Sequence, residues 1–320
     1  MKLPTTLFAA LVLTHPAMSA NAGTSAAAPL PEVTVTAPRP PTPEELAGNA
    51  VPDFARAHAV PAVVTGQLAR WQVGICPLTT GLSPDFNDFV SARLLAIAAS
   101  VGAPHELRGG CSRGGKHDVF ILFSTDPAKT LDEVVKQDPR VLGFHYPSQT
   151  QSVEKINHPI QGWYATVSRG AFGGKTIDEA EPLLPLAVDV LRAGKHPPGL
   201  PGSRLSSSIS SEIYNALIVV DTKKILGRSI GSIADYLAVL TLTMASAPEH
   251  CGTLPSILDM MLPNCGDSKD LTGITAGDLA FLKALYKNDL EEILPLERSN
   301  ILDSMTRQFR SADRGMGSAP

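Results

Sequence analysis

Apolar residues follow two spacings along the chain, and these predict both strands and helices. Short apolar runs predict buried strands at 119–123 and 216–220, and a third strand is predicted at 162–168. Five segments carry the spacing or the end signals of helices: 83–101, 128–136, 230–245, 275–286 and 296–310. Strands that alternate with helices indicate a layered domain, which we assign to the α+β class.

Two predicted helices stand out. The segment 230–245 is apolar almost all round, so we expect a long buried helix at the centre of the core. The segment 275–286 opens with Thr275 and Asp278 at the spacing of a capping box, which fixes where this helix begins.

Composition divides the chain into four parts. Residues 23–65 are rich in Ala, Pro, Thr and Ser and lack the apolar material that would offset ordering, which predicts a disordered linker. A signal peptide at 1–22 precedes this linker. A single globular domain is predicted for 66–312, with 194–202 as a long loop, and a disordered tail for 313–320.

The first 22 residues have the features of a secretory signal peptide. Lys2 precedes a short apolar stretch at 7–13, and Ala20-Asn21-Ala22 fits a cleavage site. The most apolar later segment, 237–245, is shorter than the roughly 20 residues that a membrane span needs. We therefore expect an exported protein, periplasmic or secreted, with no transmembrane segment after cleavage.

Four cysteines remain after this cleavage, and they predict disulfides. In an oxidising compartment four cysteines suggest two bonds, for which three connectivities are possible. We favour the near neighbours, Cys76 with Cys111 and Cys251 with Cys265. No C-x-x-C and no H-E-x-x-H occurs, so neither a metal site nor a cofactor is predicted.

The charge balance narrows the choice of partner. The chain has 27 Lys and Arg against 31 Asp and Glu, a formal net charge of −4. Nucleic-acid binding requires a strong basic excess, so nucleic acid is excluded as the main partner. An envelope protein or a small ligand is the expected partner.

Two glycine-rich segments resemble phosphate-binding loops, but neither fits the motif. In 170–176 three residues, not four, separate the first glycine from Gly-Lys-Thr. The segment 110–117 ends in histidine and precedes its strand when it should follow one. Both are predicted to be surface turns.

Gly227 to Gly231 matches the G-x-S-x-G pattern of a hydrolase nucleophile, with Ser229 at its centre. A hydrolase would combine Ser229 with an acid such as Asp235 and with His250, the only histidine downstream. Several residues separate the preceding strand from this motif, where a sharp turn is required. We therefore favour a helix cap at Ser229 and keep the hydrolase as the alternative.

The densest group of polar and aromatic residues lies between 145 and 164. One interpretation is a ligand pocket lined by the rings of Trp163 and Tyr164; the other, which we favour, is a strand with core aromatics. The pocket would be formed by His145, Tyr146, His158, Gln161, Trp163 and Tyr164.

The patch Glu32 to Ala37 resembles the energy-coupling box of TonB-dependent outer-membrane receptors. The rest of the chain lacks the serial amphipathic strands of such a receptor. A β-prone patch in a linker is favoured, and a soluble component that works beside these receptors is a third functional option.

Residues 210–290 resemble the matrixin-like zincin metalloproteases. The shared order is a strand, a long apolar helix, a turn at 255–259 (Pro-Ser-Ile-Leu-Asp), and a helix with Thr275, Asp278, Leu285 and Tyr286. The chain resembles still more closely a family of exported bacterial proteins that share this ending and have no assigned activity. The resemblance implies a zincin-like fold with a mixed sheet and a long buried helix.

The zinc site of that family is missing. Under this alignment Asp235 and Val239 take the places of the first two zinc histidines, and Tyr236 takes the place of the catalytic glutamate. The family's glycine and third histidine fall on Leu242 and Ala245. The expected function is therefore a non-catalytic envelope protein, either a binding or a structural module. The alternative is a periplasmic hydrolase that uses Ser229 or a metal site which the motifs do not reveal.

Overall fold

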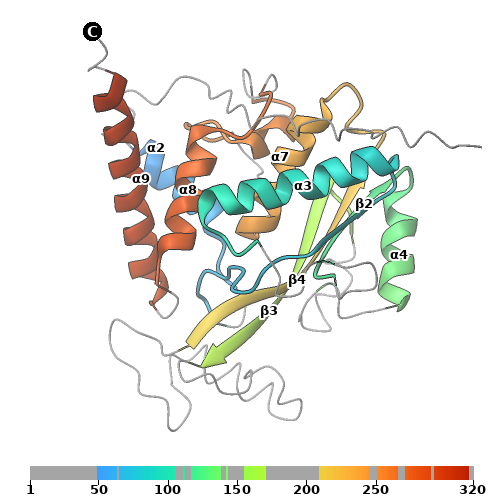
Figure 1. Cartoon of the computed structure of the whole chain (residues 1–320), viewed down its shortest axis with the longest axis horizontal. Helices are drawn as coiled ribbons and strands as arrows, with labels where there is room; N and C mark the ends of the chain where they lie inside the picture. Colours follow the sequence, from blue (N-terminus) through green and yellow to red (C-terminus); the bar gives the residue numbers. More distant parts are fainter. Residues whose placement is uncertain are drawn as a thin grey trace, which may run out of the picture. The chain divides into compact units, whose positions relative to one another are not determined.

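The computed structural model describes residues 49–62, 65–105, 111, 117–137, 142, 155–170, 209–245, 251–265, 271–289 and 292–316. Four strands in this part form one mixed sheet (Figure 1): β1 (Pro77–Thr80), β2 (Val119–Ser124), β3 (Ile160–Gly170) and β4 (Ile209–Asp221). Their order is β1-β2-β4-β3. This confirms the α+β class and the mixed sheet.

Strand direction changes once across the sheet. β1 pairs parallel to β2, and β2 pairs parallel to β4 with Val119 opposite Ala216. β3 runs antiparallel to β4, with a register shift between Ala165 and Thr166. The two parallel pairs require crossover connections, and α3 (Pro84–Val101) supplies the one between β1 and β2.

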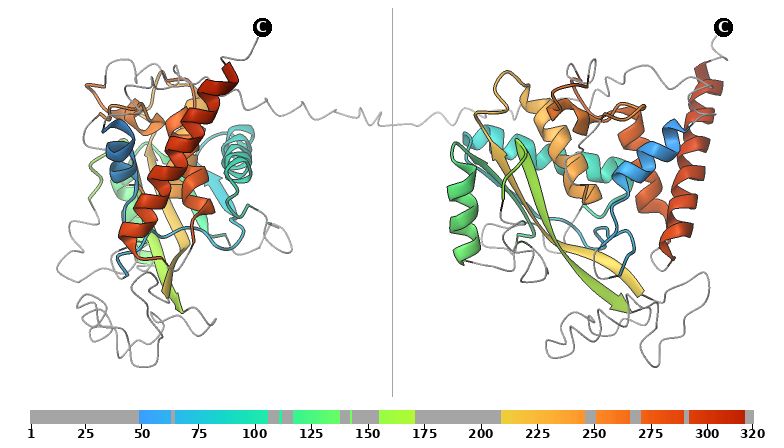
Figure 2. Two further views of the ribbon diagram at one scale, coloured as in Figure 1. Left: turned by 90° about the vertical axis from the view of Figure 1, so that its left-hand side faces the viewer. Right: turned by 180° about the vertical axis from the view of Figure 1, so that it is seen from behind.

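Alternating side chains of β4 build two cores on the two faces of the sheet. Ala216, Ile218 and Val220 belong to the main core with α3 and α7 (Ile230–Thr243). Leu217 and Val219 face the opposite side, where they pack with Leu131 of α4 (Pro127–Gln137). The sheet therefore lies between α3 and α7 on one face and α4 on the other (Figures 1 and 2).

A second helical group lies beside this sandwich. It contains α2 (Ala50–His58), α8 (Ala276–Lys287) and α9 (Leu294–Met316), which Figure 2 shows side by side. A short 3₁₀ helix, η4 (Ile257–Met261), packs against α7 between the two groups. Helices α2, α8 and α9 share an apolar core that is separate from the main core.

Helix α2 corrects the predicted organisation. The linker predicted for 23–65 does not extend through Ala50–His58, because this segment is a helix with buried Val51 and Phe54. At the other end α9 runs to Met316, into the predicted tail 313–320. β1 was not predicted, because four residues are too few for a clear alternation.

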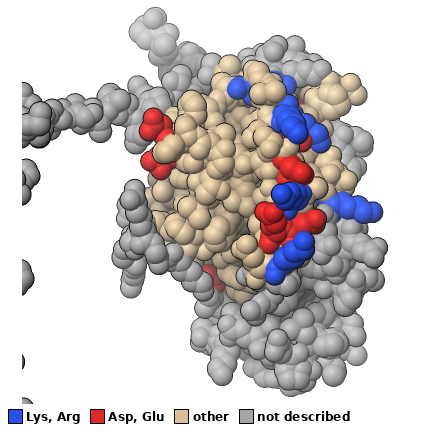
Figure 3. All heavy atoms as spheres, turned by 90° about the vertical axis from the view of Figure 1, so that its right-hand side faces the viewer, with Lys and Arg blue, Asp and Glu red and all other residues tan. Residues whose placement is uncertain are grey.

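The described helices include none that is long and apolar enough to cross a membrane. Figure 3 shows the side on which α4 lies: charges of both signs follow one strip, and most of the other described surface is uncharged. Lys129 and Glu133 of α4 are 3.9 Å apart in this exposed region. Mixed charge of this kind gives no large positive field for an anionic partner.

Candidate functional site

Helix α7 is the centre of the candidate site, and its C-terminal end is closed by three aromatic side chains. The last carbonyls of a helix have no partner within the helix. Here the Trp71 indole donates to the carbonyl of Thr241 at 3.0 Å. The hydroxyls of Tyr164 and Tyr286 donate to the carbonyls of Leu240 and Leu242 at 2.7 and 3.0 Å. Three of the last carbonyls of this buried helix end therefore have side-chain donors within the apolar core.

Asp235 of α7 forms a buried ion pair with Arg93 of α3. Arg93 Nε and Nη2 donate to Asp235 Oδ1 and Oδ2 at 2.5 and 2.9 Å. The backbone N–H of Ile274 donates to Oδ2 at 2.9 Å. The side chain of Asp235 is only 1% exposed and that of Arg93 11%. Both carboxylate oxygens are thus already bound by the protein itself, in the bidentate geometry that arginine favours.

The other positions aligned with the zinc site lie in the main core. Tyr236, Val239, Leu242 and Ala245 are all buried. Apolar side chains supply no metal ligand atoms. Tyr236 has a hydroxyl without a hydrogen-bond partner among the described residues. Burial raises the pKa of Tyr236, and the nearby Asp259 carboxylate raises it further.

Ser229 is the N-cap of α7. Its hydroxyl accepts a hydrogen bond from the N–H of Ser232 at 3.0 Å, the geometry of a helix cap. The preferred interpretation of the G-x-S-x-G pattern is thereby confirmed. Asp235 binds Arg93 and does not support a catalytic imidazole, while His250 lies outside the described residues. The described residues do not bring a serine triad together at Ser229.

The described members of the predicted ligand pocket fall on different surfaces. Trp163 faces the α4 side of the sheet and packs with Leu217 and Val219. Tyr164 faces the main core, so the two rings do not line one pocket. Gln161 closes the loop before β3 through the backbone of Lys155 and Asn157.

Several other predicted features lie partly or wholly outside the described residues. His158 is half-buried in the loop before β3, but its proposed neighbours His145 and Tyr146 are not described. The signal peptide, the Glu32–Ala37 patch and most of both glycine-rich segments are also outside. These remain sequence predictions.

Both predicted disulfides are confirmed. Cys76 bonds to Cys111, and Cys251 bonds to Cys265. The second bond closes a short loop that contains η4, so it fixes the turn that follows α7. Closing a loop of this length is expected to stabilise the fold by about 3 kcal/mol in the chain-entropy model.

A serine, a histidine and an aspartate do meet in the structure, at a place that the sequence did not indicate. His58 of α2, Ser256 before η4 and Asp278 of α8 form a chain of polar contacts, here called the His58 chain. His58 Nε2 lies 3.1 Å from Ser256 Oγ, which donates to Asp278 Oδ1 at 2.6 Å. His58 was missed because it was assigned to the linker, although Phe54 and His58 share the spacing of one helix face.

The order of groups in the His58 chain is unsuitable for a nucleophile. A catalytic triad places histidine between serine and acid, so that the imidazole accepts the serine proton. Here the serine lies in the middle and donates its hydroxyl hydrogen bond to the acid, and its side chain is completely buried. Asp278 also accepts from the backbone N–H groups of Ile257 and Thr275 at 2.9 and 3.0 Å. Its role is to join the turn at η4 to the start of α8.

Asp259 is the other titratable group of this turn. Burial raises its pKa to about 6, and the Asp278 carboxylate adds to the effect, while the N–H groups of Ser256 and Gly252 oppose it. The Asp259 Oδ2 atom accepts from Ser256 N at 3.0 Å. A carboxyl group with a raised pKa contributes stability at low pH, and that contribution is lost as the pH rises through about 6.

Replacing Asp259 by asparagine is therefore expected to remove this pH dependence. The asparagine keeps an acceptor for Ser256 and carries no charge, so it should stabilise the protein by about 1–2 kcal/mol at pH 7.5. This stability difference should shrink as the pH is lowered through about 6 toward 4.5. Urea unfolding of both at the two pH values measures this. An unchanged stability difference across this range would show that Asp259 does not titrate as described.

Among the described residues no group of three or more His, Cys, Asp or Glu side chains could hold a metal ion. Comparisons with family models, with curated proteins and with solved structures found no match for this chain. The chemistry of the described side chains is therefore the basis on which a function can be proposed.

Proposed function

We propose that the chain is an exported, non-catalytic binding or structural module of the cell envelope, on a scaffold that resembles a zincin without its zinc site. The observation that carries this proposal is the bonding of Asp235. At the position aligned with the first zinc histidine, a carboxylate is bound on both oxygens by Arg93 and by a backbone N–H. The ion pair between Arg93 and Asp235 holds α3 against α7.

The order of elements supports the scaffold part of the proposal. The buried helix α7 is followed by the turn at Ser256 and then by α8 with its capping box. Asp278 connects the turn to α8 through Ser256 and Ile257. A scaffold of this kind carries no activity by itself, so the site decides the function.

Export is supported by the two disulfides together with the sequence of the N-terminus. Disulfides persist in oxidising compartments and are rare in the cytosol. The bonds between Cys76 and Cys111 and between Cys251 and Cys265 leave no free cysteine. They are compatible with a periplasmic or secreted protein.

The test is to purify the exported protein without chelator and to measure its metal content and its reaction with a fluorophosphonate probe. We expect less than stoichiometric zinc and no labelling that depends on Ser229. Ser229→Ala is compared with Ser100→Ala, which changes an exposed serine near the C-terminal end of α3. Stoichiometric zinc would overturn the proposal in favour of a metallohydrolase. Labelling lost only in Ser229→Ala would establish the serine hydrolase.

A further inference from the structure

Helix α2 covers apolar surface of α8 and α9. Val51 and Phe54 belong to one core with Phe281 of α8 and with Ile301, Met305 and Phe309 of α9. A Cβ atom at Gly277 would lie 3.1 Å from the Phe54 ring, so this glycine leaves room for the ring. At the C-terminal end of α2, Arg298 donates a hydrogen bond to the Ala59 carbonyl, and His58 Nε2 lies 3.1 Å from Ser256 Oγ.

His58 is buried at the boundary between α2 and the domain. Its side chain is 6% exposed, and its ring stacks on Phe54 with centroids 4.0 Å apart. His58 Nδ1 lies 2.8 Å from the Phe54 carbonyl oxygen. Because a carbonyl oxygen can only accept, Nδ1 carries a hydrogen and donates it. In the neutral ring Nε2 is then an acceptor.

The Nε2 atom has no hydrogen supplied to it. Ser256 has one hydroxyl hydrogen, and the Asp278 carboxylate takes it at 2.6 Å, whereas Nε2 is 3.1 Å from the same oxygen. Nε2 is therefore the atom of the His58 chain that binds an added proton. The added hydrogen could bond to Ser256, but it would bring a full charge into this buried position.

The surrounding charges compensate only part of that charge, and the Asp278 carboxylate is the one that favours it. Asp278 is separated from the ring by Ser256 and is already bonded to backbone N–H groups. Asp259 of η4 loses its negative charge as the pH falls through about 6. Arg298 of α9 places a second cation beside Ala59.

On α2 itself, Asp53 and Arg56 are exposed and pair with each other at 2.8 Å. Burial has the largest influence on the pKa of His58 and lowers it, while Asp278 and the Phe54 carbonyl oppose this effect.

We propose that α2 is released by acid: protonation of His58 at Nε2 drives the ring out of the boundary and opens α2 from α8 and α9. A released ring in water binds its proton more tightly than the docked ring. Docking is therefore strongest above the ordinary pKa of histidine and weakens as the pH falls below it. Release uncovers the apolar side chains Phe281, Ile301, Met305 and Phe309. This switch needs no partner, so it does not depend on the proposed function.

Amide hydrogen exchange of α2, corrected for intrinsic rates, tests the switch between pH 7.5 and pH 5.5. The opening constant of α2 should rise by up to about tenfold, the limit for a histidine of ordinary pKa 6.5 that stays neutral when docked. Amides of α3, in the main core, are the internal reference and should change less than twofold. Unchanged or stronger protection of α2 at pH 5.5 would overturn the proposal.

Three variants identify the group that titrates. His58→Gln can still donate to the Phe54 carbonyl but cannot be protonated, so its α2 exchange should differ less than twofold between the two pH values. His158→Gln, in the loop before β3, should keep the full response of the unchanged protein. Asp259→Asn should also keep it. A response that persists in His58→Gln, or that disappears in Asp259→Asn, would assign the switch to another group.

A titration of the unchanged protein covers the case in which His58→Gln fails to fold. The ring nitrogen signals of His58, followed by NMR, should move below pH 6.5 in step with the exchange of α2. A His58 ring that is already protonated at pH 7.5 while α2 stays docked would overturn the proposal.

Discussion

Replacing Arg70 by methionine is expected to lower the free energy of unfolding by about 3–5 kcal/mol, the cost of breaking a buried ion pair from one side. Arg70 is 2% exposed and its partner Glu297 is completely buried, with Nη2 and Oε1 3.2 Å apart. The guanidinium also donates to the carbonyl oxygens of Leu285 and Asp289 at the end of α8. Methionine leaves these carbonyls and the Glu297 carboxylate without their donor.

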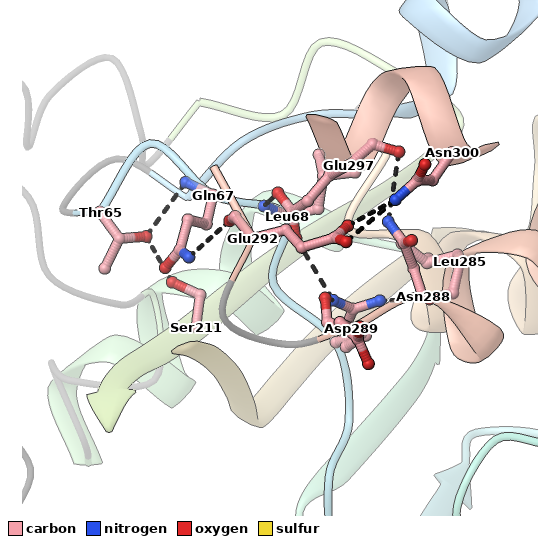
Figure 4. Close-up of polar contacts among 11 residues, drawn as sticks. Thr65, Gln67, Leu68, Ser211, Leu285, Asn288, Asp289, Glu292, Glu297 and Asn300 are labelled. Carbon is pink, nitrogen blue, oxygen red and sulfur yellow. Dashed lines mark hydrogen bonds and ion pairs between the residues drawn. The ribbon is translucent and has the colours of Figure 1, made fainter. Parts of the chain in front are cut away.

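Figure 4 shows the polar contacts around Glu297. The backbone N–H of Leu68 donates to Glu297 Oε2 at 3.0 Å, so the carboxylate links the segment before β1 to α9. Asn288, directly after α8, donates to the backbone carbonyl of Glu297. Asn300 of α9 donates to the side-chain carboxylate of Glu292. Burial raises the pKa of Glu297 to about 7, although Leu68 and Arg70 oppose the shift.

The measurement is urea unfolding, with Arg307→Met of α9 as the matched control. Arg307 is exposed, so its replacement should change stability by less than about 0.5 kcal/mol. The double variant Arg70→Met/Glu297→Leu removes both charges and should recover part of the loss. If Arg70→Met alone costs less than about 1 kcal/mol, the pair is not buried as described.

Replacing Asp278 by asparagine is expected to lower the free energy of unfolding by about 3–4 kcal/mol, because hydrogen bonds to one carboxylate fix both the turn and the start of α8. Asp278 Oδ1 accepts from Ser256, and Oδ2 accepts from the N–H groups of Ile257 and Thr275. A neutral asparagine amide loses the negative charge that strengthens these bonds, and it keeps only one acceptor oxygen. If that oxygen faces Ile257 and Thr275, the Ser256 hydroxyl can no longer donate to this side chain and must accept from its amide group.

Thermal and urea unfolding of Asp278→Asn measure this effect. Asp303→Asn on the exposed side of α9 is the control and should be close to neutral. Amide exchange should show that η4 and the first turn of α8 lose protection together. Loss of protection in α8 alone would mean that Asp278 acts only as a helix cap.

The sequence predicted the elements whose signals are local. Three such signals each depend on residues within one segment: the apolar spacing of α3, the apolar character of α7 and the capping box at Thr275. The structure confirms all three. β4 extends from Ile209 to Asp221, beyond the predicted 216–220, because its first residues are polar and buried. Polar residues at such positions give no hydrophobic signal.

The polar contacts of the site could not be predicted in the same way. Asp235 was identified as important for its place in an alignment, but its partner Arg93 is 142 residues away in the chain. His58 and Ser256 are separated by 198 residues. One sequence contains the residues of such pairs and says nothing about their distance, so only the fold reveals that these groups are bonded to each other.

The aromatic closure of α7 sets an order for folding. Trp71, Tyr164 and Tyr286 come from segments that span most of the domain, and each satisfies a carbonyl in the last turn of one helix. Contacts between residues so far apart in sequence form late, because long loops must close first. A growing chain that ends before α8 still lacks the donor for Leu242. The C-terminal end of α7 therefore becomes complete only when nearly all of the domain has been made.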